Sequence, residues 1–147
     1  MTDVLSKQQR SALMAKVRSK HTKPELIVRR ALHAAGFRFR LHVRTLPSTP
    51  DIVLPRLRTI VQVKGCFWHG HSCLKGHLPK QNRAFWREKI ERNRERDRQN
   101  ERRLRSAGWR VKTVWECRVR RWGSTHLQER LSFILKDDHR ARGAGSR

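Results

Sequence analysis

The sequence of 147 residues is poor in acidic side chains and contains no tyrosine. Only 12 Asp and Glu residues stand against 36 Lys and Arg residues, which gives a formal net charge of +24 at pH 7. A compact domain with this excess repels itself unless a polyanion neutralises it. Nucleic acid is therefore the first partner to expect, and a membrane surface is the second.

The sequence also lacks a long apolar run, and its first residues have no apolar core of the kind found in signal peptides. Its three cysteines are an odd number, which argues against a disulfide framework and suits a metal site in a reducing compartment. We therefore expect a cytoplasmic protein that does not cross a membrane.

Hydrophobic residues make up 36% of the chain and charged residues 33%, a balance that by itself favours disorder. Five tryptophans, five phenylalanines and clear apolar periodicity instead predict one folded domain over residues 21–136. Residues 1–20 are expected to form a basic helix, which either packs on the domain or wraps nucleic acid as an arm. The polar residues 137–147 are expected to be a disordered tail.

The clearest helix start lies at Thr22, which can cap the helix, with Pro24 in the first turn and Gly36 as the stop. Glu25 stands three residues after Thr22. It either completes a capping box or extends the apolar stripe of the helix toward the core.

The rest of the domain predicts an α/β fold. Strands are expected over residues 37–41, 51–54, 59–63 and 109–117, with the second and third antiparallel. Further helices are expected over residues 79–107, as one long helix or as two with a bend, and over residues 124–136. Asp97 falls on the helix face that carries Trp86 and Ile90, and a carboxylate on such a face points to a functional site.

Thiols and imidazoles gather directly after the third expected strand, and a further thiol ends the fourth. Thiolate and imidazole are the ligands of closed structural zinc sites. The pattern predicts such a site, with His69 and His77 as alternative ligands to the main set of Cys66, His71, Cys73 and Cys117.

A second constellation joins Asp51, which begins the second expected strand, to Gln62 and Lys64, which end the third. Phosphodiester-cleaving folds use a carboxylate at this place to hold Mg²⁺, a backbone carbonyl as a further ligand, and a cation to offset the phosphate charge. The two strands therefore predict a nuclease site.

Several motifs together resemble the very short patch repair (Vsr) mismatch endonucleases, over nearly the whole chain up to the last helix. The most specific block runs from Gly65 to Cys73 and reads GCFWHGHSC. The other matching residues are Pro50-Asp51, Phe85-Trp86, Asn93, Asp97, Gly108-Trp109-Arg110-Val111 and Val114-Trp115-Glu116-Cys117. The resemblance implies a restriction-endonuclease-like α/β fold, in which helices flank a central mixed sheet, and a structural zinc.

The resemblance also implies an activity: a Mg²⁺-dependent nick in double-stranded DNA, 5′ of the thymine in a T:G mismatch left by deamination of 5-methylcytosine. We accordingly expect a monomeric, nucleoid-associated nuclease.

The same resemblance implies roles for individual residues. Asp51 resembles the Mg²⁺ ligand, to which Val63 adds its backbone carbonyl, and His69 resembles the histidine that activates water. Asp97 and Glu25 resemble its supporting carboxylates. The residues that resemble DNA-contacting side chains are Phe67, Trp68 and Trp86 beside the mismatch and Met14 on the arm.

Lys64 departs from the family pattern, which usually carries histidine there. We expect His69 to be the base and Lys64 an electrostatic aid, and the alternative is that Lys64 itself takes the proton. Two other functions compete: a related homing or restriction nuclease that cuts undamaged DNA, and a non-catalytic zinc-containing nucleic-acid-binding module. A pure binder has no use for the set Asp51, His69 and Asp97.

Overall fold

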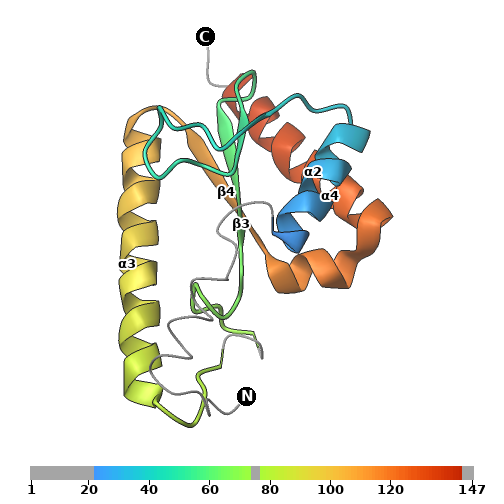
Figure 1. The fold of residues 1–147 in the computed structure, drawn as a ribbon. Coiled ribbons are helices and arrows are strands. Elements are labelled where there is room, and N and C mark those ends of the chain that lie inside the picture. Colours follow the sequence, from blue (N-terminus) through green and yellow to red (C-terminus); the bar gives the residue numbers. More distant parts are fainter. Residues whose placement is uncertain (1–21, 74–76, 144–147) are drawn as a thin grey trace.

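The computed structural model describes residues 22–73 and 77–143 of the chain (Figure 1). The expected helix or arm over residues 1–20, with Met14, lies outside this part. Within it, none of the helices combines the length and apolarity that a bilayer crossing needs.

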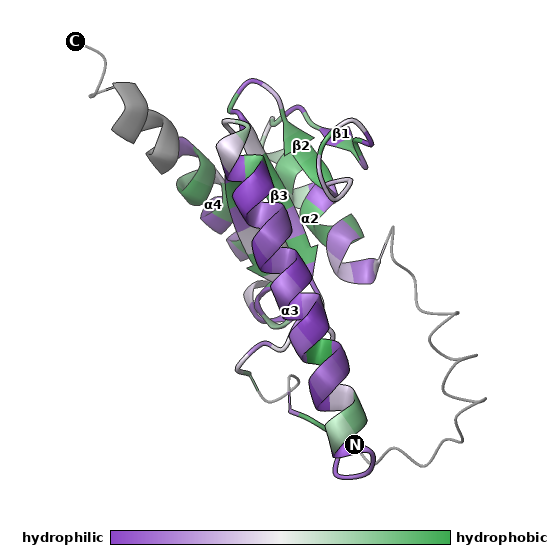
Figure 2. Cartoon of the chain, turned by 90° about the vertical axis from the view of Figure 1, so that its left-hand side faces the viewer, coloured by the Kyte–Doolittle hydropathy of each residue, from purple (hydrophilic) through white to green (hydrophobic). Residues whose placement is uncertain are grey.

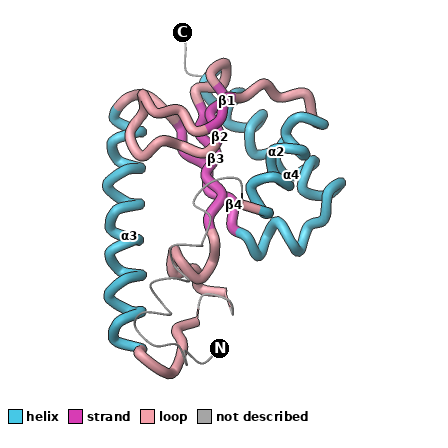
Figure 3. The backbone as a smooth tube through the Cα atoms, in the orientation of Figure 1, coloured by secondary structure: helices cyan, strands magenta, loops and turns pink. Residues whose placement is uncertain are grey.

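Four strands form one sheet in the order β1–β2–β3–β4 (Figure 3). β1 (Arg40–Leu41), β2 (Ile52–Leu54) and β3 (Thr59–Lys64) run antiparallel to one another in turn, as predicted for the second and third. β4 (Arg110–Trp115) is parallel to β3 over its whole length, with Lys64 opposite Trp115. The sheet is therefore mixed, and the parallel pair is connected through a helix.

Helices cover both faces of the sheet. Figure 1 shows α2 (Lys23–Ala34) and α4 (Glu116–Gly143) together on one face and α3 (Arg83–Ser106) alone on the other. In β2, Ile52 and Leu54 belong to the core under α2 and α4, whereas Val53 belongs to the core under α3. Side chains of a strand alternate between faces, so a strand buried on both faces reads as a continuous apolar run. The predicted α/β class is confirmed, and the arrangement is compatible with a nuclease fold.

The long helix α3 is hydrophilic on its outer face (Figure 2), where charged side chains three or four positions apart form ion pairs. Arg98 and Glu95 lie 2.8 Å apart, as do Arg105 and Glu101. The buried residues of α3 are Trp86, Ile90 and Leu104. Asp97 lies between Ile90 and Leu104 in the sequence and is half-buried. It is therefore a polar residue on the same face of α3 as the buried apolar residues, and this face lies toward the sheet.

The first strand is shorter than predicted. The sequence predicts a strand over residues 37–41, and β1 contains only Arg40 and Leu41. Phe37 and Phe39 nevertheless pack against the larger core. The alternation therefore reports the burial of every second side chain and not a hydrogen-bonded ladder.

The last helix begins earlier than predicted and extends further. The sequence predicts a strand to Cys117 and a helix over 124–136, whereas α4 starts at Glu116 and continues to Gly143. Residues 137–143, predicted to be disordered, are thus helical. The helix bends at Gly123, whose φ of 67° and ψ of 174° are not helical. Val119 is buried in the larger core, whereas the arginines on either side of it are exposed. One buried residue in a turn of exposed ones suits an amphipathic helix.

Candidate active site and metal centre

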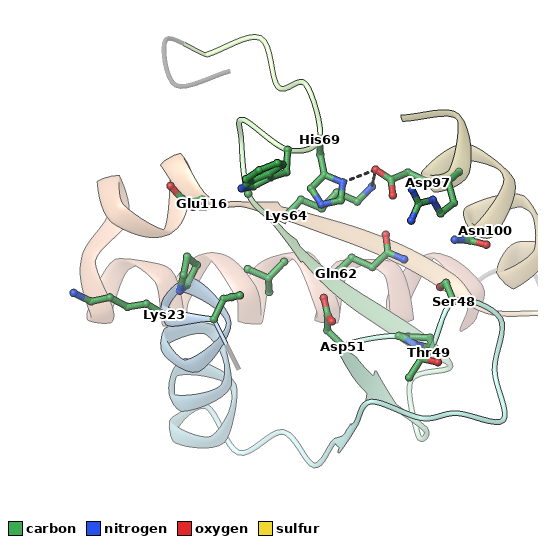
Figure 4. Close-up of a pocket in the computed structure, with 17 residues that line it drawn as sticks. Lys23, Ser48, Thr49, Asp51, Gln62, Lys64, His69, Asp97, Asn100 and Glu116 are labelled. Carbon is green, nitrogen blue, oxygen red and sulfur yellow. Dashed lines mark hydrogen bonds and ion pairs between the residues drawn. The ribbon is translucent and has the colours of Figure 1, made fainter. Parts of the chain in front are cut away.

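An open pocket of about 670 Å³ lies beside the carboxyl end of β3, between the start of α2, the loop before β2, and α3 (Figure 4). The residues that line it include Asp51, Lys64, His69 and Asp97. Four of the five predicted catalytic residues therefore share one pocket, although they come from four different segments. The fifth, Glu25, does not line the pocket and lies in the core beside Asp51.

Asp97 binds two of these side chains through one oxygen. His69 Nδ1 lies 2.6 Å from Asp97 Oδ2, and Lys64 Nζ lies 3.7 Å from the same atom. Burial raises the pKa of Asp97, but the hydrogen bond from His69 and the charges of His69 and Lys64 together lower it below its usual value. Asp97 is therefore an ionised acceptor, so a neutral His69 carries its proton on Nδ1. The Nε2 atom keeps a lone pair that can accept a proton.

The loop after β3 is fixed against α3, and this brings His69 to Asp97. Asn93 on α3 donates from Nδ2 to the backbone carbonyl of Trp68 at 2.9 Å. Gly70 has φ of 62°, and a Cβ there would meet Ile90 and Arg94 at 2.8 Å. Only glycine allows the loop to approach the helix this closely.

The surroundings of Asp51 disfavour the ionised form of its carboxyl group. Burial raises its pKa to about 6, with a further contribution from the charge of Glu25, while a hydrogen bond from the Val63 amide and the charges of His69 and Arg29 oppose the rise. In an extended strand the N–H and C=O of one residue point to the same side. The carbonyl of Val63 therefore points toward Asp51 as well.

Glu25 is buried, with 2% of its surface exposed, so it faces the core and does not sit at the helix surface. Thr22 caps the helix, because its Oγ1 accepts a hydrogen bond from the Glu25 amide at 3.4 Å. Neither of its carboxylate oxygens has a hydrogen-bond partner in the described part of the chain, although Arg29 lies 3.2 Å away. A buried carboxylate without hydrogen-bond donors from the described residues, beside the half-buried carboxylate of Asp51, provides surroundings that a divalent cation fits.

His42, which sequence reasoning missed, completes this cluster. One ligand atom from each of Glu25, His42 and Asp51 lies within 4.8 Å of the others. The missing signal was the register of β1 on β2, which places His42 opposite Asp51 and which a strand of two residues does not reveal in the sequence.

A second cluster lies at the other side of the loop and contains the four predicted zinc ligands. One atom from each of Cys66, His71, Cys73 and Cys117 lies within 4.8 Å of the others. Tetrahedral zinc with thiolate ligands needs sulfur atoms roughly 3.8 Å apart, as follows from a Zn–S bond of about 2.3 Å. His77 and His69, the alternative ligands, are not members of this cluster. The donor set and its spacing fit a metal ion.

Trp115 lies between the Cys and His cluster and Lys64, which lines the pocket. His71 stacks on Trp115 with ring centroids 4.2 Å apart, and Lys64 Nζ lies 5.9 Å from the Trp115 ring centroid. Burial raises the pKa of the Cys66 thiol to about 12, because the thiolate would lie in an apolar environment without a cation. A bound metal would supply that charge.

The three predicted DNA-contacting aromatics of the described chain lie together at the N-terminal end of α3. Phe67 lies 5.1 Å from Trp68 and 5.4 Å from Trp86, measured between ring centroids. Phe85, which was not predicted as a contact residue, stacks edge-on against Trp86 at 5.1 Å and is 38% exposed. Trp86 itself is 6% exposed and forms the base of this aromatic cluster.

Comparison with known proteins agrees with this architecture. Residues 2–75 match the family model described as DNA mismatch endonuclease Vsr. The chain is 52% identical over 135 residues to the type II nicking enzyme V.XorIIP of Xanthomonas oryzae pv. oryzae, covering 92% of this chain and 98% of that one. It is 45% identical over 137 residues to the type II nicking enzyme V.NmeAIP of Neisseria meningitidis, covering 93% and 96%.

The chain is also 40% identical over 120 residues to the DNA mismatch endonuclease Vsr of Escherichia coli, covering 82% of this chain and 77% of that one. The chain therefore belongs to the Vsr family of DNA endonucleases.

Proposed function

We propose that this endonuclease nicks one strand of duplex DNA 5′ of the thymine in T:G mismatches that arise from 5-methylcytosine, and that it requires Mg²⁺. The observation that carries the proposal is the pocket in which His69, held by Asp97, faces Asp51. An imidazole oriented by one carboxylate, together with a second carboxylate in the same pocket, would form the apparatus of metal-assisted phosphodiester hydrolysis.

Asp51 and the Val63 carbonyl would hold the cation, and the buried Glu25 would add negative charge beside it. Mg²⁺ held there would polarise the scissile phosphate and neutralise charge on its oxygens. The raised pKa of Asp51 supports this assignment, because a carboxylate buried beside another carboxylate gains most from a cation.

His69 would take the proton from the attacking water through Nε2, and Asp97 would stabilise the imidazolium that forms. The Lys64 Nζ atom lies 3.7 Å from the Asp97 carboxylate, so its side chain would reach the same side of the pocket as His69. It would stabilise the negative charge that develops on the phosphate. The departure from the family pattern at position 64 would therefore change the group that stabilises the phosphate charge, and His69 would remain the base.

The aromatic cluster would provide mismatch selection. Inserting side chains between base pairs costs a few kcal/mol of unstacking, and a mispaired step costs less than a matched one. Phe67 and Trp68 are partly exposed and rest on the buried Trp86, so they can be presented to the base step without rearranging the core.

The Cys and His cluster would hold a structural Zn²⁺. A closed site of four protein ligands contributes to folding and leaves no position for substrate. It would tie Cys117 in the first turn of α4 to the loop that carries His69, and the two meet where the Cys117 amide donates to Cys66 Sγ at 3.4 Å. The protein would act as a monomer on its DNA.

The proposal is tested by incubating the purified protein with duplexes that carry one T:G pair or a T:A pair in the same sequence, each strand labelled separately. We expect a Mg²⁺-dependent nick in the thymine strand of the T:G duplex and none in the T:A control. Equal cleavage of both duplexes would favour a restriction-type nuclease. Binding without cleavage by wild-type protein would favour the non-catalytic module.

A further inference from the structure

His42 is held against Asp51 by the backbone as well as by its side chain. It directly follows β1, whose pairing places Leu41 opposite Ile52, so His42 falls opposite Asp51. The His42 amide donates to the Asp51 carbonyl at 3.1 Å. Its φ of 46° lies in the left-handed region, which is rare outside glycine and in which Asn, Asp and His are enriched.

The imidazole of His42 points into a charged cluster and is 12% exposed. Its Nε2 atom lies 3.0 Å from Arg29 Nη2 and 3.3 Å from Glu25 Oε1, both on α2. Its Nδ1 atom lies 3.9 Å from Asp51 Oδ1. The two ring nitrogens therefore face different partners, with α2 on one side and the proposed cation ligand on the other.

The chemistry of the arginine fixes the tautomer. A guanidinium group has only donors, so in its contact with Arg29 the His42 Nε2 atom is the acceptor. A neutral imidazole then carries its proton on Nδ1, the nitrogen that faces Asp51. The contact of Nε2 with Glu25 Oε1 is consequently not a hydrogen bond, which agrees with the absence of a partner for that oxygen in the described residues.

We propose that His42 is a positioning residue of the cation site, in which Arg29 fixes the imidazole and the Nδ1–H of His42 orients the Asp51 carboxylate. The separation of 3.9 Å is longer than a hydrogen bond. Hydrogen bonds of catalytic sites are often long in the free enzyme and tighten when the complex forms. Asp51 Oδ1 would then face His42, and the other oxygen would be left for the cation beside the Val63 carbonyl.

The inference deepens the proposed function and rests on its assignment of Asp51 as a cation ligand. It is distinct from direct coordination by His42, which would need a lone pair on Nδ1. The bond from Arg29 occupies the Nε2 lone pair, and a neutral ring has no second one. Mutation of a group that orients a metal ligand commonly lowers metal affinity by about 10- to 100-fold.

The test measures Mn²⁺ binding to the full-length protein, alone and with a T:G duplex, by calorimetry and by pulsed electron paramagnetic resonance. The variant His42→Asn suits the left-handed backbone, and its shorter side chain cannot reach both Arg29 and Asp51. His42→Gly is a second variant that suits this backbone. The matched control is His33→Asn, since His33 is exposed on the same helix α2 that carries Glu25 and Arg29.

We expect both His42 variants to bind Mn²⁺ about 10- to 100-fold more weakly, with the ¹⁴N coupling of bound Mn²⁺ unchanged and the His33 control unaffected. The Mg²⁺ concentration for half-maximal nicking should rise by a similar factor, whereas the rate at saturating Mg²⁺ should be largely kept. A purely structural defect would lower the saturated rate instead.

Unchanged Mn²⁺ affinity in both variants would overturn the positioning role. A ¹⁴N coupling that is present in wild-type protein and lost in the His42 variants would overturn it too, in favour of direct coordination. If wild-type protein binds no Mn²⁺ with or without the duplex, or if Asp51→Asn binds it as well as wild type, the failure lies in the proposed cation site itself.

Discussion

The Nδ1 atom of His69 lies 2.6 Å from Oδ2 of Asp97, and this pair joins a loop residue to the middle of the longest straight helix. The carboxylate fixes which nitrogen of the imidazole holds the proton. It also turns the other nitrogen into the acceptor that hydrolysis requires.

Replacing His69 should therefore cost more than replacing Lys64. We expect His69→Ala to lower the single-turnover nicking rate on the order of 10²–10⁴-fold, the range for a positioned general base. Lys64→Ala should lower it less, on the order of 10²-fold at most, because it removes a charge near the phosphate and not the base.

The pH dependence separates the two roles. The Lys64→Ala rate should keep the wild-type pH profile near neutrality, and the profile should disappear with His69→Ala. The rates are measured by rapid quench from pH 6 to pH 9 on a T:G duplex. A His69→Ala enzyme near full rate, beside an inactive Lys64→Ala enzyme, would assign the base to Lys64.

Asp51 should cost the folded protein stability at neutral pH. Its pKa is raised to about 6 from an ordinary value of 3.8, so the folded state holds the proton more tightly than the unfolded chain. Stability then falls as pH rises between these values, and the loss is complete above pH 6. Without added Mg²⁺, Asp51→Asn should be more stable than wild type at pH 7.5 by on the order of 2 kcal/mol.

That gain should shrink toward pH 5, and urea denaturation at both pH values measures it. Saturating Mg²⁺ should reduce the difference by stabilising wild type alone. A variant that is less stable than wild type at pH 7.5 would show that Asp51 holds the fold together, contrary to its surroundings.

The Cys and His cluster should be needed for folding. Cys117→Ala should lose the metal and most of the folded protein, because a closed metal site contributes binding energy directly to folding. Zinc content by atomic absorption and helicity by circular dichroism measure both effects. His77→Ala is the matched control, since His77 lies outside the cluster and should keep one zinc per chain. Stoichiometric zinc in the Cys117 variant would remove Cys117 from the ligand set.

The sequence was sufficient for the order of the strands, for the long helix and for the residues of the Cys and His cluster, because each of these rests on a local pattern. Asp97 illustrates this, because a carboxylate on the apolar face of a helix needs a partner, and the structure provides His69. His42 shows the limit. Its partners come from α2 and from the start of β2, and only the register of a two-residue strand brings them together. Similarly, the early start of α4 depends on the burial of Val119 and not on a capping signal.

Binding to DNA should depend steeply on salt. The net charge of +24 requires phosphate neighbours, and each neutralised phosphate contributes about −0.9 to the slope of log K against log salt. Six or more such contacts give a slope of about −5 or steeper. The slope is measured by fluorescence anisotropy on a T:G duplex without Mg²⁺, with the T:A duplex as the control of equal charge. A nearly flat line would contradict an electrostatic contribution to binding.

The aromatic cluster should decide which base pair is cut and should matter little for overall affinity. Trp68→Ala removes a partly exposed ring that rests on Trp86 at 5.9 Å between centroids. We expect the preference for T:G over T:A in nicking to fall by about 10- to 100-fold, since stacking on a base is worth about 1–3 kcal/mol. Affinity for the T:A duplex should stay close to wild type, because phosphate contacts position the protein and carry no sequence information.

Phe85→Ala should show a smaller effect of the same kind, because Phe85 is exposed at the edge of the cluster and touches the mismatch only if the wedge extends that far. Phe133→Ala is the matched control, an exposed aromatic on α4 that is 67% exposed and lines neither pocket nor cluster. The assay is competition between labelled T:G and T:A duplexes in one tube. A Trp68→Ala enzyme with the wild-type preference would remove the wedge, and mismatch selection would then have to come from the bending of the DNA alone.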